Sequence, residues 1–339
     1  EDARRELEKS REVIAATLHA KTSEIYFTSG GSESDNWAVK NIAAACKKKG
    51  RHIITTNIEH HAILNSCEYL EKLGYDVTYL EVDGDGLISP EQVMDAIRPD
   101  TTLISVMFAN NEVGTIEPIY QIGKIAREKQ ILFHTDAVQA YAQIPLSVKY
   151  YPVDLLSASA HKFHGPKGVG FLYIRDGIDI PSFIHGGSQE RGKRAGTENV
   201  AGIVGMAKAA EIAYGNMRKR VQKEIMLRNY LIERVMHEIP DAKLNGHRSI
   251  RLPGNVNFSF KGLEGASLLI LLDEDGICAS GGSACNTGEE RISYVIKALG
   301  VPEEYAPGTI RITLCGDTTR ADVDAALVSL KRNIAVLRG

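Results

Sequence analysis

Between residues 24 and 174, runs rich in β-branched and aromatic residues alternate with amphipathic runs of helical length. The predicted strands are residues 24–28, 52–56, 77–82, 103–108, 131–134, 154–157 and 168–174. The predicted helices between them are residues 34–49, 61–73, 90–97 and 119–129. This alternation predicts an α/β fold with a mainly parallel seven-stranded sheet that is covered on both faces. Because the connection from Ser157 to Gly168 is too short for a crossover helix, we expect one strand there to run antiparallel.

After residue 175 the pattern changes. A Gly-rich, charged loop at 185–197 leads into a long helical region at 200–239. Beyond it, the predicted strands are residues 255–260, 276–280 and 309–314. The predicted helices are residues 265–272, 292–299 and 321–337. This order predicts a second, smaller α+β domain. We expect a large domain at 1–215 and a small domain at 216–339, and a chain of 339 residues is long enough for two domains.

Composition narrows the class of protein. The chain is 43% hydrophobic and 24% charged, with a formal net charge of −3, which is typical of a soluble globular protein. This balance gives no reason to expect nucleic acid or a membrane surface as a partner. The five cysteines are odd in number and widely spread, which predicts a reducing, cytoplasmic compartment. None forms a C-x-x-C pair, so we expect no metal site.

Polar residues gather where the predicted strand 154–157 ends. Ser159, His161 and Lys162 stand there, ahead of the Gly-Pro-Lys-Gly segment at 165–168. The carboxyl ends of strands are where ligands bind in open α/β sheets. A Lys beside hydroxyl and imidazole donors can form a Schiff base with a cofactor while the donors hold an anion. For a single Lys, a surface position is the commoner interpretation, so the other segments must decide.

Two further segments have the properties of a cofactor site. Residues 28–35 (TSGGSESD) form a glycine loop before a helix, which suits anion binding, although Ser32 is also a good helix N-cap. The Lys-Ser/Thr of a P-loop is missing. Asp136, after an apolar strand, can pair with a protonated pyridine nitrogen or cap a helix. Asn111 and Gln139 can bond a phenolic oxygen or stabilise turns.

Three more residues have open interpretations. His60 can stack on a cofactor ring or be structural. Cys285 lies among Gly, Ser, Asn and Thr, which favours a reactive thiol over a buried one. Arg311 is a charge in an apolar strand and needs a partner, for which a substrate carboxylate is one candidate.

Together these segments resemble the cysteine desulfurases of the NifS/IscS type, pyridoxal-phosphate (PLP) enzymes of fold type I in the aminotransferase class V family. The resemblance covers almost the whole chain. Its motifs are residues 28–36 (TSGGSESDN), Glu59-His60, 110–114 (NNEVG), Asp136-Ala137-x-Gln139, His161-Lys162, 165–168 (GPKG), Arg194-x-Gly196-Thr197 and Ser283-Ala284-Cys285.

The resemblance implies a role for each matching residue. The implied cofactor-binding residues are Gly31, Ser32, His60, Asn111, Asp136, Gln139, Ser159, His161, Lys162 and Thr197. Among them, Lys162 would bind PLP covalently, and Thr197 would reach the phosphate of the other subunit in a homodimer. The implied catalytic residues are Lys162, Cys285 and His60, and the substrate carboxylate would bind Arg311 and Asn111.

The implied reaction converts L-cysteine into L-alanine and leaves the sulfur as a persulfide on Cys285, in a long loop of the group I kind. An acceptor such as an iron–sulfur scaffold protein would then take the sulfur. Three alternatives remain open: a selenocysteine lyase, an aminotransferase of the same fold, and an inactive scaffold that binds sulfur-acceptor proteins.

The sequence departs from the family pattern in three places, one of which is His164, where a Tyr is common. The family normally begins with a segment that holds a YLDxxATT-like strand and a GNPSS-like loop, whereas this sequence opens within a helical pattern at Leu7, Val13, Ile14 and Leu18. We expect residues that precede Glu1 to be absent from it, with any targeting signal among them. After Arg311, residues 315–317 (CGD) replace the usual Gly-Arg-containing turn.

Overall fold

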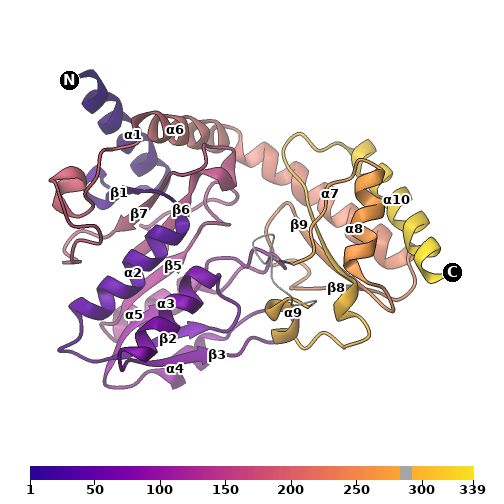
Figure 1. Ribbon diagram of the computed structural model, residues 1–339, viewed down its shortest axis with the longest axis horizontal. Coiled ribbons are helices and arrows are strands. Elements are labelled where there is room, and N and C mark those ends of the chain that lie inside the picture. Colours follow the sequence, from indigo (N-terminus) through magenta and orange to yellow (C-terminus); the bar gives the residue numbers. More distant parts are fainter. Residues whose placement is uncertain (283–291) are drawn as a thin grey trace. The chain divides into compact units, whose positions relative to one another are not determined.

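The computed structural model describes residues 1–282 and 292–339, so the predicted nucleophile Cys285 lies outside the described residues (Figure 1). The chain forms two compact units. Unit 1 holds residues 1–80, 88–109 and 117–217, and unit 2 holds 81–87, 110–116 and 218–339. The sequence predicted one boundary near residue 215, whereas the contacts also assign two short earlier segments to unit 2.

Unit 1 is built on a seven-stranded sheet in the order β1-β7-β6-β5-β4-β2-β3. Its strands are β1 (Ile25–Thr28), β2 (His52–Thr56), β3 (Asp76–Leu80), β4 (Thr101–Ser105), β5 (Leu132–Asp136), β6 (Leu155–Ser159) and β7 (Gly170–Ile174). Neighbouring strands from β3 to β6 pair in parallel, and β7 runs antiparallel to both β6 and β1. The predicted α/β fold with its antiparallel strand is confirmed.

Helices cover this sheet because their apolar stripes need a buried face. They are α1 (Asp2–Leu18), α2 (Gly31–Ala45), α3 (His61–Lys72), α4 (Pro90–Ala96), α5 (Ile119–Glu128), α6 (Val200–Gly215) and the short η1 (Thr22–Glu24), η2 (Ala160–Phe163) and η3 (Gln189–Gly192). Helices α1 and α6 pack side by side (Figure 1). Trp37 on α2 is fully buried with Ile63 of α3 and Leu103 of β4, and each such side chain stabilises the fold by about 1.5–3 kcal/mol.

Unit 2 has a three-stranded antiparallel sheet in the order β10-β9-β8. Its elements are α7 (Met217–Glu238), β8 (Ala242–Leu244), β9 (Asn255–Phe260), α8 (Gly265–Glu274), α9 (Tyr294–Ala298), η4 (Ala306–Gly308), β10 (Thr309–Thr313) and α10 (Arg320–Arg338). The core of the unit packs Phe258 and Phe260 against Leu231 and Leu330 from the helices. None of the helices in the described parts of the chain combines the length and the apolar character that crossing a membrane requires.

Three features of this half of the chain differ from what the sequence predicts. The helical region at 200–239 is two helices, because Gly215 and Asn216 end α6 and both residues favour helix ends. Residues 276–280 form no strand beyond an isolated bridge from Ser280 to Arg311. Strand β8 was not predicted, since it has only three residues, all half-buried.

A buried ion pair connects α1 to the strand edge of unit 1. Arg11 donates two hydrogen bonds of 2.9 Å to the carboxylate of Glu190, and the side chains are only 5% and 3% exposed. Glu190 also accepts the N–H of Phe27 at 2.9 Å, and Arg11 donates to the carbonyl of Ile25 at 2.8 Å. Helix α1 and β1 therefore depend on the same charge pair.

We predict that Arg11→Met lowers the free energy of unfolding by about 3–5 kcal/mol, because the carboxylate of Glu190 would stay buried without its partner. Chemical denaturation at neutral pH measures this. The matched control is Lys21→Met, which removes an exposed pair with Asp176 and should change little. Equal effects of both substitutions would show that the buried pair has no special weight.

Candidate functional site

The loop between β1 and α2 forms a backbone cradle. Gly30 has a φ of +153°, which favours glycine, and a Cβ on Gly31 would lie 2.6 Å from Cγ2 of Val138. A Cβ on Gly30 would lie 3.5 Å from Oγ of Ser159, so this serine borders the cradle. The first N–H groups of a helix have no acceptor within it, and Ser32 is exposed in the first turn of α2. The cradle can therefore hold an anion such as a phosphate.

Ser159 and His161 add a side-chain donor to the cradle. Oγ of Ser159 lies 2.9 Å from Nδ1 of His161. Burial lowers the pKa of His161, and the charges of Lys162 and Lys167 lower it further, so the ring is neutral at pH 7. In one tautomer the Nε2–H remains as a donor, and in the other the Ser159 hydroxyl remains. Either way, the pair offers one hydrogen bond to an anion.

The structure brings together the predicted residues Asp136, His60 and Lys162. Asp136 is the last residue of β5, only 5% exposed, and its Oδ1 accepts the N–H of Val138 at 2.9 Å. Burial raises the pKa of this carboxyl, while the nearby charges of His60 and Lys162 lower it. Lys162 lies in η2, which directly follows β6. A carboxylate and an ammonium group therefore stand within electrostatic reach at the carboxyl edge of the sheet.

His60 is held by the helix that it caps. Its Nδ1 accepts the N–H of Ala62 at 3.1 Å, at the first turn of α3. Burial lowers the pKa of His60, the charge on Asp136 raises it, and His61 and Lys162 lower it again. The ring is therefore neutral, with its proton on Nε2, and is suited to stacking on a flat ligand without repelling a positive charge.

One residue of this cluster was missed by the sequence analysis. Asp35, on α2, is only 1% exposed, and one polar side-chain atom from each of Asp35, His60 and Asp136 lies within 4.8 Å of the other two. The signal that could have identified it is the helical spacing of the apolar residues around it. Asp35 shares its helix face with the buried Ala38, Val39 and Ile42, so an acidic residue occupies an apolar stripe.

Two other predicted residues of unit 1 lie in loops. Gln139 is half-buried in the turn after β5, and Thr197 is exposed after η3. The loop of Thr197 is tied to α2, because Nε of Arg194 lies 2.8 Å from the carboxylate of Glu33. The structure describes one chain, so the predicted reach of Thr197 into a second subunit stays a prediction.

In unit 2 the structure brings Asn111 and Arg311 together. Nη1 of Arg311, on β10, donates to the carbonyl of Asn111 at 2.8 Å. Oδ1 of Asn111 is buried and has no hydrogen-bond partner among the described residues. Next to it, Glu112 accepts the hydroxyl hydrogen of Ser293 at 2.6 Å, and a Cβ on Gly282 would lie 3.4 Å from Glu112. The residues on either side of the undescribed segment thus approach Glu112.

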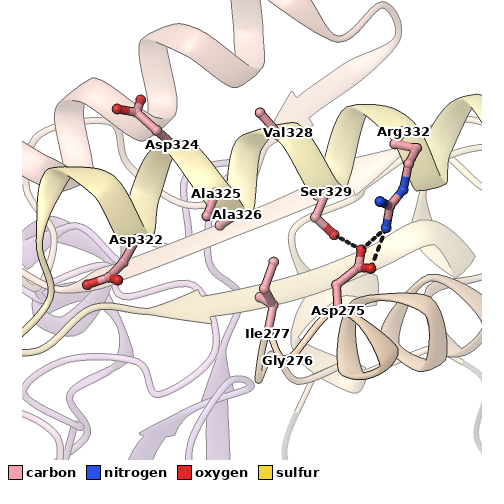
Figure 2. Close-up of a pocket in the computed structure, with 10 residues that line it drawn as sticks. All are labelled: Asp275, Gly276, Ile277, Asp322, Asp324, Ala325, Ala326, Val328, Ser329 and Arg332. Atoms are coloured by element: carbon pink, nitrogen blue, oxygen red, sulfur yellow. Dashed lines mark hydrogen bonds and ion pairs between the residues drawn. The ribbon is translucent and has the colours of Figure 1, made fainter.

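A separate cavity of about 760 Å³ lies along α10 in unit 2, and none of the predicted site residues lines it (Figure 2). At one side of it, Asp275 binds Ser329 and Arg332, as Figure 2 shows. Asp322 and Asp324 add further acidic groups to its wall. The cavity contains none of the chemistry that the sequence motifs predict.

His134, on β5, makes the stability of this region depend on pH. It is fully buried, and burial lowers its pKa to about 3, below the usual value near 6.5. Below pH 6.5 the unfolded chain takes up a proton that the folded chain does not. The stability that His134 contributes is therefore complete above about pH 6.5 and is lost as the pH falls toward 3.

We predict that the free energy of unfolding falls less steeply with falling pH in His134→Gln. The slope between pH 6 and 4 should decrease by up to about 1.4 kcal/mol per pH unit. Denaturation at several pH values measures the slope for each protein. The exposed His237 is the control, since His237→Gln should leave the slope as it is in the original chain. An identical slope in the His134 variant would contradict the prediction.

Comparison with known proteins gives the family of the chain. Residues 1–326 match the aminotransferase class-V family. A cysteine desulfurase IscS of Dictyoglomus turgidum is 53% identical over 337 residues, which is 99% of this chain and 86% of the relative. One from Clostridium botulinum is 54% identical, over 96% of this chain and 82% of the relative. A solved NifS-like protein superposes with a TM-score of 0.93 at 41% identity, covering 99% of this chain and 89% of that one. The chain belongs to the aminotransferase class-V family and, within it, to the cysteine desulfurases of the IscS type.

Proposed function

We propose that this chain uses PLP to release L-alanine from L-cysteine and receives the sulfur on Cys285. The observation that carries the proposal is the cluster of Asp136, His60 and Lys162 at the carboxyl edge of the sheet in unit 1. Its relatives, which are named cysteine desulfurases, support the same activity.

The described residues fit PLP. The Gly31 cradle, where a Cβ would collide with Val138, has room for phosphate oxygens close to the backbone. The buried Oδ1 of Asn111 lacks a described partner, as expected of an amide that is completed by a ligand. A carboxylate such as Asp136 can pair with a protonated ring nitrogen. We assign the phosphate to Gly31, Ser32, Ser159 and His161, and the phenolic oxygen to Asn111 and Gln139.

PLP, when bound, supplies an electron sink that eases removal of the α-proton of an amino acid. We propose that Nζ of Lys162 binds the cofactor and then takes and returns that proton. The nearby Asp136 keeps the ring nitrogen protonated, and the neutral ring of His60 stacks without opposing that charge. Burial favours the neutral form of His60, whereas the ionised form of Asp136 depends on the groups around it.

Arg311 would bind the carboxylate of the substrate. Its guanidinium group is half-buried and is oriented by its hydrogen bond to the carbonyl of Asn111. A guanidinium group suits a carboxylate because it can donate two parallel hydrogen bonds. This would place recognition of the α-carboxylate on the rigid strand β10.

Cys285 would act as the nucleophile. Its thiolate would attack the sulfur of L-cysteine, so that an S–S bond forms as the C–S bond of the substrate breaks. The persulfide then passes its outer sulfur to a thiol of an acceptor, such as an iron–sulfur scaffold protein. We further propose a homodimer, in which Thr197 serves the partner's phosphate site, and a cytoplasmic location, which the spread of cysteines supports.

We predict that Cys285→Ser reduces alanine release from L-cysteine to background while PLP stays bound, because a hydroxyl group cannot accept the sulfur as a persulfide. The assay measures L-alanine with added PLP and a thiol reductant, and absorbance measures bound PLP. The control is Cys278→Ser, an exposed thiol that should not be needed. Unchanged alanine release in the Cys285 variant would contradict the proposal and favour a lyase that needs no enzyme thiol, such as a selenocysteine lyase.

We predict that Gly31→Ala weakens PLP binding at least about tenfold, or roughly 1.4 kcal/mol, because the new Cβ displaces the cradle or Val138. Absorbance titration of the cofactor-free protein measures the dissociation constant. Gly215→Ala at the end of α6 is the control, since nothing lies within 4 Å of its Cβ position. Equal affinity in the two variants would rule out a phosphate at this cradle.

A further inference from the structure

Two carboxyl groups meet out of water at the carboxyl edge of the sheet. Asp35 lies on α2 and is 1% exposed, and Asp136 lies at the end of β5 and is 5% exposed. One carboxylate oxygen of each aspartate and one ring nitrogen of His60 lie within 4.8 Å of one another. Two buried carboxylates at this distance repel each other strongly, so they cannot both be ionised near neutral pH.

The surroundings of Asp136 stabilise its ionised form better than those of Asp35 do. Burial raises the pKa of Asp136, but the nearby His60, a hydrogen bond from the N–H of Val138 and the charge of Lys162 lower it in part. Each of these contacts stabilises a negative charge on Asp136 and leaves the proton to the other carboxyl.

The surroundings of Asp35 favour its neutral form. Its Oδ1 receives no hydrogen bond from the described residues, and the nearest ring nitrogen, Nε2 of His134, is 3.7 Å away. His134 is itself neutral, because it is fully buried, and its nitrogens are bonded to the hydroxyls of Ser105 and Ser157 at 2.9 Å and 3.0 Å. The nearby buried Glu59 also raises the pKa of Asp35, because a negative charge on either carboxyl disfavours one on the other.

We propose that Asp35 is a positioning residue that holds the one proton shared by the two carboxyls and so leaves Asp136 as the ionised member. The inference rests on the proposed function, in which Asp136 pairs with the ring nitrogen of PLP. Burial first, and then the charge on Asp136, raise the pKa of Asp35 well above its usual value, and the hydroxyl of Ser157 lowers it only in part. One negative charge, on Asp136, then faces one positive charge on the cofactor ring.

Infrared spectroscopy of the full chain with bound PLP tests this proposal at neutral pH. Proteins are prepared with ordinary aspartate and with aspartate ¹³C-labelled in its side-chain carboxyl. We expect the stretching band of a protonated carboxyl group that shifts with the aspartate label. The band should disappear in Asp35→Asn and remain in Asp136→Asn. The control is Asp95→Asn, which changes an exposed residue of α4 and should leave the band intact.

Three results would overturn the proposal: no protonated carboxyl band, a band that does not shift with the aspartate label and so belongs to a glutamate, or a band that survives Asp35→Asn and vanishes in Asp136→Asn. If Asp35→Asn fails to fold, the labelling of the unchanged chain still decides between aspartate and glutamate. The test is separate from turnover. A chain that shows the band but releases no alanine contradicts the desulfurase proposal and supports the protonation of Asp35.

Discussion

A carboxylate held out of water at the end of β5 governs the arrangement of polar groups in unit 1. Burying Asp136 alone would be costly, so cationic or hydrogen-bonding groups must lie close to it. The parallel sheet supplies them, because the segments after β2 and β6 carry His60 and Lys162 to the same edge. The fold thus determines which side chains compensate the charge, and those side chains are the ones that a PLP enzyme needs.

Burial also sets the protonation of the three histidines around this edge. It lowers the pKa of His60, His134 and His161, so all three are neutral at pH 7. Lys162 is then a positive group close to the carboxyl of Asp136. A neutral His60 can lie against a positively charged ring, and a neutral His134 leaves Asp35 without a cation. One physical cause, desolvation, thereby separates the roles of groups that look equivalent in the sequence.

Much of this could be predicted from sequence patterns, since strand periodicity and terminal polar residues are local signals. The seven strands of the large sheet and the antiparallel β7 follow from such signals. Helical periodicity predicts that Asp35 is buried, but not that it lies beside Asp136, because this depends on how α2 packs on β5. The three residues of β8 are too few to show a strand pattern. Residues 276–280 were predicted as a strand, but of these only Ser280 forms a bridge, to Arg311.

In unit 2, the tripeptide of residues 110–112 contacts both the proposed substrate-binding Arg311 and residues next to the segment that holds the proposed nucleophile. Asn111 orients Arg311 through its carbonyl, and the adjacent Glu112 binds Ser293 through its carboxylate. The carbonyl of Glu112 accepts the amides of Asn255 and Asn257 at 3.2 Å, which fixes the tripeptide to β9. Gly282 also lies close to Glu112. The residues before and after the segment that carries Cys285 therefore both approach Glu112, which is next to the residue that binds Arg311. If Cys285 and Arg311 have the proposed roles, a change at Glu112 would therefore affect sulfur transfer and carboxylate binding together.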